Sequence, residues 1–181
     1  ATTRSTWTAA DGWAWAHHTG DEPAYYIFSP APRNYDLNAV TADPAVMETY
    51  LRARVTGSSS VEEALFEAVK ETLIFTPTPA ATRAASIRML ARVPGVTVTE
   101  NTTDPKGRPA TKVAFVDEQH RPGVVNAIYL DPATTQLVAE LGTQNGQPYY
   151  TCIYTERRIV KSLPDDIIKT LGADRIEKSI P

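Results

Sequence analysis

The amino-acid sequence predicts an α+β fold: a curved antiparallel β-sheet, a half-barrel-like meander, with three consecutive helices packed on one of its faces. Short β-type segments alternate with turn-forming residues between Pro94 and Leu141, and the connections between them are too short for parallel crossovers. Three segments with helical spacing of apolar residues precede this region, and each needs a surface to cover its apolar side. We therefore expect one sheet of about six to eight strands.

The β-meander is expected at about residues 96–161. Residues 96–99 alternate apolar and polar side chains, which is typical of a half-buried strand. Later strands are predicted from β-branched and aromatic content at residues 111–117, 124–130, 137–141 and 149–155, with 157–161 as an extended continuation. Asn145-Gly146 predicts a hairpin between the last two strands, because both residues tolerate positive φ.

The helical insertion is expected at about residues 43–93. Asp43-Pro44 supplies a cap and a first-turn proline, Ser60 and Glu63 form a capping box, and Thr78-Pro79 opens the third helix. The three apolar stripes are Val46, Tyr50, Leu51 and Val55; Leu65, Phe66, Val69 and Leu73; and Ala84, Ile87, Leu90 and Ala91. We expect Leu65, Phe66, Val69, Leu73, Ile87 and Leu90 to be buried against the sheet.

The two ends of the chain carry weaker patterns. The Asp11-Gly12 pair between aromatic-bearing segments suggests a hairpin, residues 25–28 a further strand, and residues 165–171 a short helix capped by Gly172. Trp13 and Trp15 share one strand face, since they are two residues apart. That face either fills the core, which we favour, or forms an aromatic platform for a ligand.

Length, composition and charge exclude several classes of protein. The 181 residues suit one domain, and the net charge of −3 gives no basic footprint for nucleic acid. No apolar run approaches the length of a membrane span. Because the chain begins at Ala1 without a Met or a signal-like segment, we expect it to be part of something longer.

Few residues invite a catalytic interpretation. Cys152 is the single cysteine, and with no base to activate it we expect a buried, unreactive thiol. His17 and His18 are adjacent on a strand, so they point to opposite faces and cannot chelate one ion together, and His120 lies in a turn. Asp117 and Asp131 are expected to cap turns, and the Arg157-Arg158 pair to be solvated. We therefore expect no catalytic residue, no metal site and no cofactor, and we assign no ligand-binding residue.

The sequence resembles a family of uncharacterised single-pass membrane proteins of high-GC Gram-positive bacteria, often encoded beside sigma factors. Its members carry a helix ending in L-P-G-V, a D-x-x-G-R-P loop and an F-D-P-x-T-x-x-L hairpin, which correspond here to Val93–Val96, Asp104–Pro109 and Tyr129–Leu137. The Trp7–Gly12 segment is similar to the early W-x-A-x-D-G strand end of the family. Val93 and Thr135 depart from the family pattern without disturbing the turns. The resemblance implies a membrane anchor outside this chain, a domain outside the cytoplasm and no enzyme.

A second resemblance is architectural. A curved antiparallel sheet with helices on one side is similar to the half-barrel of bacterial lipoprotein carriers and mycobacterial lipid-binding lipoproteins. We therefore expect a single extracytoplasmic domain, residues 1–181, that acts in sensing or protein interaction with another membrane or envelope protein. The alternative is a carrier that binds a lipid or another hydrophobic ligand in the concave face of the sheet, and a hydrolase using Cys152 or a histidine is a third hypothesis.

Overall fold

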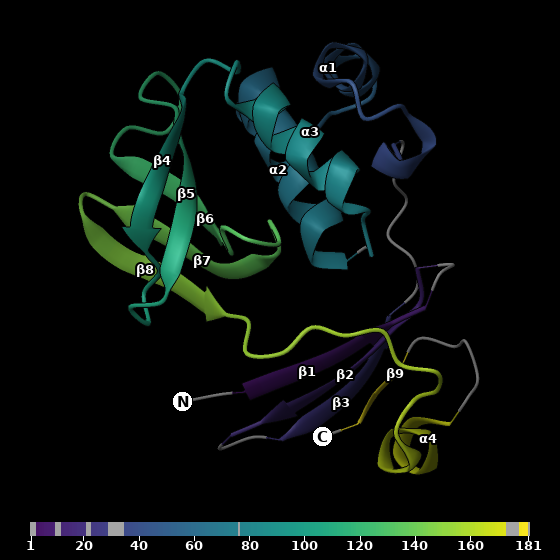
Figure 1. Ribbon diagram of the computed structural model, residues 1–181. Coiled ribbons are helices and arrows are strands. Elements are labelled where there is room, and N and C mark those ends of the chain that lie inside the picture. The colour runs from purple at the N-terminus through teal and green to yellow at the C-terminus, as the bar shows by residue number, and fades with distance from the viewer. Residues whose placement is uncertain are drawn as a thin grey trace. The chain divides into compact units, whose positions relative to one another are not determined.

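The computed structural model describes residues 3–9, 12–20, 23–28, 35–75, 77–172 and 178–180 (Figure 1). The chain divides into two compact units, where the sequence suggests one domain. The meander unit is Asn34–Arg157, and the terminal unit combines Ala1–Arg33 with Arg158–Pro181. The α+β class is confirmed, because the described residues form antiparallel sheets and α-helices. The expectation of one continuous sheet is wrong, because the strands form two separate sheets.

The meander unit contains a five-stranded sheet in which every strand pairs with its neighbour in sequence. Its strands are β4 (Val96–Thr103), β5 (Pro109–Val116), β6 (Val124–Leu130), β7 (Leu137–Gln144) and β8 (Gln147–Ile153), and all the pairs are antiparallel. The predicted hairpin is confirmed: Asn145 and Gly146 join β7 to β8 with φ of 50° and 76°. Residues 157–161 are not a strand, because β8 ends at Ile153.

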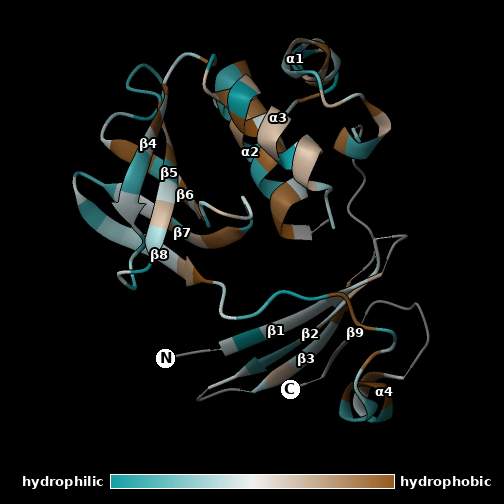
Figure 2. Ribbon diagram, in the orientation of Figure 1, coloured by the Kyte–Doolittle hydropathy of each residue, from teal (hydrophilic) through white to brown (hydrophobic). Residues whose placement is uncertain are grey.

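Three α-helices precede the sheet, after a short 3-10 turn at Leu37–Ala39. They are α1 (Pro44–Arg52), α2 (Val61–Phe75) and α3 (Ala80–Leu90). Asp43 caps α1 as predicted, since its Oδ1 accepts hydrogen bonds from the amides of Ala45 at 2.8 Å and Val46 at 3.1 Å. Each helix carries both hydrophobic and hydrophilic residues around its axis (Figure 2). Every helix among the described residues is too short or too polar to cross a bilayer.

The core of the meander unit lies between the helices and one face of the sheet. Leu65, Phe66, Val69, Leu73 and Leu90 are buried there as predicted, together with Val113, Phe115, Ile128, Leu130 and Leu137 of the sheet and its connections. Ile87 is only half-buried, so its prediction was wrong. In α3 the buried residues are Thr82, Ala85, Ser86, Met89 and Leu90, and in α1 they are Met47 and Leu51. The buried face of α3 therefore combines the small side chains of this set with Met89 and Leu90, and Ile87 lies at its border.

The terminal unit holds a four-stranded antiparallel sheet and one helix. Its sheet has the order β1 (Thr3–Thr8), β2 (Ala14–Thr19), β3 (Ala24–Phe28) and β9 (Lys178–Ile180), and α4 is Asp165–Leu171. Trp15 is 4% exposed and packs with Ile27, Ile167 and Leu171, with Trp13 partly buried beside them. The core interpretation of Trp15 is therefore confirmed. Asp11 of the predicted hairpin turn lies outside the described residues.

Candidate functional site

An open groove of about 460 Å³ lies at one end of the five-stranded sheet. Its lining comes from the loop between β5 and β6, from the first residue of β6, from the last residue of β7 and from β8. The residues are Arg121, Pro122, Val124, Gln144 and Tyr149. The backbone amide of Asn145 donates to the carbonyl oxygen of Gly123 at 2.8 Å, which holds the β7–β8 hairpin against the β5–β6 loop at this end.

Arg121 is held in the groove by a buried carboxylate. The guanidinium donates to Oε1 of Glu63, whose side chain is 5% exposed near the start of α2. Oε2 of Glu63 accepts from the amide and hydroxyl of Ser59 at 2.9 and 2.7 Å. Burial acts to raise the pKa of Glu63, but the hydrogen bonds from Ser59 and Arg121 outweigh it and leave the pKa below its usual value. The carboxylate therefore stays ionised and neutralises Arg121.

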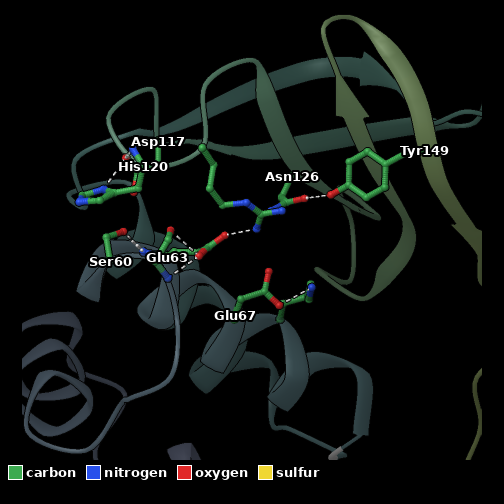
Figure 3. A network of polar contacts seen from close by, with 10 residues as sticks. Ser60, Glu63, Glu67, Asp117, His120, Asn126 and Tyr149 are labelled. Atoms are coloured by element: carbon green, nitrogen blue, oxygen red, sulfur yellow. Dashed lines mark hydrogen bonds and ion pairs between the residues drawn. The ribbon is translucent and has the colours of Figure 1, made fainter.

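A second link joins the same loop to α2. Asp117 accepts from the amide and ring Nδ1 of His120, at 3.1 and 2.9 Å (Figure 3). It also interacts with the hydroxyl of Ser60. Burial acts to raise the pKa of Asp117, and the hydrogen bonds from Ser60 and His120 lower it below its usual value. Asp117 therefore caps its turn as predicted and ties the β5–β6 loop to the start of α2.

Tyr149 of β8 also lines the groove. Its hydroxyl donates to Oδ1 of Asn126 at 2.7 Å (Figure 3), and its ring lies over the α-carbon of Gly142. A β-carbon at Gly142 would lie 2.5 Å from Cζ of Tyr149, so only glycine leaves room for the ring. The register of β7 and β8 shifts between Gly142 and Thr143, which places Tyr149 in this irregularity. Tyr149 remains 54% exposed although its hydroxyl is fixed.

A separate polar cluster surrounds Glu140 on β7, which is 4% exposed. The hydroxyl of Tyr154 donates to Oε1 of Glu140, and Nζ of Lys70 lies 4.0 Å from Oε2. Burial, together with the nearby Glu140 carboxylate, raises the pKa of Tyr150 and of Tyr154. Both phenols therefore keep their protons and act as donors toward the carboxylate.

Cys152 lies opposite Glu140 in the strand register and is half-buried, less covered than the buried thiol we expected. Its ionisable neighbours are Glu140, Tyr150 and Tyr154. None of these three neighbours is a cation, so Cys152 lacks the electropositive surroundings that are typical of a catalytic cysteine.

The other residues singled out in the sequence are scattered. His17 and His18 lie on β2, where their rings pack against Tyr25 and Tyr26 at centroid distances of 4.1 and 4.9 Å. Burial lowers the pKa of His18, and the charges of Arg4 and His17 lower it further.

Asp131 caps its turn as predicted, accepting from the amides of Thr134 and Ala133 at 2.7 and 3.0 Å. The expectation of a solvated Arg157 is wrong, because its guanidinium donates to the carbonyl oxygen of Ile74 at 2.8 Å. Within the described ranges no three His, Cys, Asp or Glu side chains are grouped to hold a metal ion.

The groove was not predicted from the sequence. Glu63 was identified as half of a capping box and Asn145-Gly146 as a hairpin, but Arg121 and Tyr149 carried no recognisable pattern. Glu63 and Arg121 are separated by 58 positions, so only the folded chain brings them together. No family model, no curated protein and no solved structure matches this chain.

Proposed function

We propose that this chain is a non-enzymatic recognition domain that binds a polypeptide partner through the Arg121–Tyr149 groove. The observation that carries the proposal is the fixed, open placement of these two side chains, one held by Glu63 and the other by Asn126. Tyrosine and arginine are the residues that contribute most often to binding hot spots. A preorganised side chain loses less rotamer entropy on binding, so it contributes more to affinity.

Recognition fits the charges of the groove better than catalysis does. The positive charge of Arg121 is neutralised by the buried carboxylate of Glu63. The other oxygen of that carboxylate accepts hydrogen bonds from the amide and the hydroxyl of Ser59. A general acid or base needs a proton that it can exchange near neutral pH. In this pair, one group stays protonated and the other stays ionised, so both serve to hold the shape of the groove.

Recognition is also favoured over the carrying of a lipid. The helix-facing side of the sheet is occupied by the chain's own side chains, such as Phe66 against Phe115, whose ring centroids lie 5.7 Å apart. A carrier would need that space for an acyl chain. Native mass spectrometry of the purified protein should find no bound lipid, and a stoichiometric lipid adduct would favour the carrier instead.

The proposed location is outside the cytoplasm, on a membrane-anchored protein, with another membrane or envelope protein as the partner. Its support is the resemblance carried by Val93–Val96, Asp104–Pro109 and Tyr129–Leu137. Protease added to intact cells that express the full-length protein should remove this domain. Protection until the cells are lysed would contradict the proposed location.

Peptides selected from a random displayed library against the purified protein test the groove. We expect peptides that bind the wild-type chain and lose about tenfold or more in affinity on Tyr149→Ala, as hot-spot residues do. Val98→Ala is the matched control, because Val98 is an exposed residue of β4 at the other edge of the sheet. Binders that are insensitive to both Tyr149→Ala and Arg121→Ala would overturn the proposal.

A further inference from the structure

The outer edge of β8 is an unpaired edge of the five-stranded sheet among the described residues. In the sheet order β4-β5-β6-β7-β8, this strand is terminal and has β7 as its only strand neighbour among the described residues. The amide of Tyr154 donates to the carbonyl oxygen of Val138 at 2.9 Å, which makes Tyr154 and Val138 a hydrogen-bonded pair. Since such pairs alternate in an antiparallel ladder, Cys152 bonds toward Glu140 of β7, and Thr151 and Ile153 turn their N–H and C=O groups to the outer edge.

The two edges of the sheet differ in how they are protected. At β4, an exposed charge, Glu100, lies in the strand, and the register shifts between Thr99 and Thr102, where Asn101 has a φ of 53°. Charges and bulges on an edge strand oppose pairing with another chain. By contrast, β8 (QPYYTCI) carries no charged residue, and after Pro148 every residue has an amide to donate. In β8 the proline and the irregularity lie at the N-terminal end, at Pro148 and Tyr149, so the stretch Tyr150–Ile153 is the less protected edge.

We propose that β8 pairs antiparallel with β8 of a second copy of this chain, about a two-fold axis at Cys152. This register places Thr151 opposite Ile153 of the second copy, so both outward residues exchange hydrogen bonds with their counterparts. A strand with no charge meets an identical strand with no charge, so the pairing brings no like charges together within β8. The same patch serves on both subunits, as two-fold symmetry requires.

The same register also covers exposed aromatic surface. Tyr150, Cys152 and Tyr154 alternate along one side of the strand, and Tyr150 is 44% exposed. Pairing about Cys152 sets Tyr150 of each copy beside Tyr154 of the other, and such aromatic pairs stabilise antiparallel sheets. Cys152 faces its own counterpart in a non-hydrogen-bonded pair, where α-carbons lie about 4.5 Å apart. That separation lies within the range that a disulfide spans.

The proposal can be tested by removing one outward-facing backbone N–H of β8. Thr151→Pro removes an outward N–H that β7 does not use, and proline is tolerated at the solvent side of an edge strand. Thr151→Val is its matched control, since it keeps the N–H and the side-chain shape. By sedimentation velocity over a range of concentrations, we expect the wild-type chain and Thr151→Val to dimerise. The dissociation constant of the dimer should rise about tenfold or more in Thr151→Pro.

A second variant and a cross-linking experiment distinguish loss of the dimer from misfolding of Thr151→Pro. Thr151→Lys keeps every backbone donor but places charges near the axis in both copies, and it should weaken the dimer as well. Copper-phenanthroline should link the folded wild-type chain into a disulfide dimer through Cys152, its single cysteine, and fail to do so in Thr151→Lys. A chain that stays monomeric at all concentrations, or a dimer unchanged by both variants, would overturn the proposal. The variants at position 151 leave the groove residues Arg121 and Tyr149 unchanged, so peptide binding and dimerisation are tested separately.

Discussion

The guanidinium of Arg108 donates from Nε to Oδ2 of Asp104 at 2.6 Å, and Asp104 has a side chain with no exposed surface. The same guanidinium donates to the carbonyl oxygens of Val138 at 2.9 Å and Tyr154 at 3.3 Å. Those two residues belong to the paired backbone where β7 and β8 meet. Arg108 thus joins the β4–β5 turn to the backbone at the start of β7 and just after β8.

Removal of this arginine should destabilise the meander unit. Arg108→Ala leaves the buried Asp104 without its cation, and hydrogen bonds to charged groups contribute about 1.5–3 kcal/mol. We expect a loss of that size in the free energy of unfolding, measured by urea denaturation. Arg108→Lys should recover only part of it, because an ammonium cannot reproduce the planar fork. Lys106→Ala, in the same loop and exposed, should stay within about 0.5 kcal/mol of wild type.

Stability should fall in acid through two buried carboxyls. Burial acts to raise the pKa of Asp104, but hydrogen bonds from Arg108 and Lys106 outweigh it, so the pKa is lowered as in Glu63. Because folding lowers both pKa values, the stabilisation is present above the unfolded-state values of about 4 and is lost as the pH falls through the folded-state values. Urea denaturation at a series of pH values should show this loss, and Glu63→Gln should flatten the curve. If the free energy of unfolding of Glu63→Gln fell equally steeply with pH, Glu63 would not contribute to the acid sensitivity.

The helical core should respond to truncation at Leu90. This side chain is fully buried in α3, and Leu→Ala changes in protein cores cost about 2–5 kcal/mol. Val46→Ala serves as the control, since Val46 is 47% exposed on α1 and should change the free energy of unfolding by less than about 0.5 kcal/mol. Similar losses in the two variants would mean that Leu90 does not pack as described.

Gly142 and Tyr149 should be energetically coupled. A β-carbon at position 142 displaces the tyrosine ring and breaks its hydrogen bond to Asn126, so Gly142→Ala should cost about 1 kcal/mol. In a Tyr149→Ala background the same substitution should cost nearly nothing, because the ring is absent. A double-mutant cycle in urea measures this coupling. Additive losses would show that the ring does not occupy the space above Gly142.

The thiol of Cys152 should react slowly in the folded protein. It is half-buried beside Tyr150, Tyr154 and Glu140, which restrict the access of a reagent and include no cation. We expect labelling by a maleimide at neutral pH to be about tenfold or more slower than in urea-unfolded chain. Equal rates in the folded and unfolded states would contradict the environment described for this residue.

Local chemistry by itself determined the strands, turns and helix ends of the meander unit. Asn145-Gly146 makes a hairpin because both positions tolerate positive φ, and Asp43 starts α1 because its carboxylate satisfies two free amides. These interactions involve neighbours in the chain, so their residues can be recognised before the fold is known.

Tertiary structure alone decided how these elements combine. The buried face of α3 followed from the position of Met89 and Leu90 in the core, whereas Ile87 of the same helix is only half-buried. Two sheets formed instead of one, because pairing between distant strands depends on contacts that local patterns do not encode. The Arg121–Glu63 pair joins residues 58 positions apart, and neither residue alone distinguishes a buried ion pair from a solvated charge. The burial of Glu63 and its pairing with Arg121 exist only in the folded chain, so the candidate site could not be recognised from the sequence.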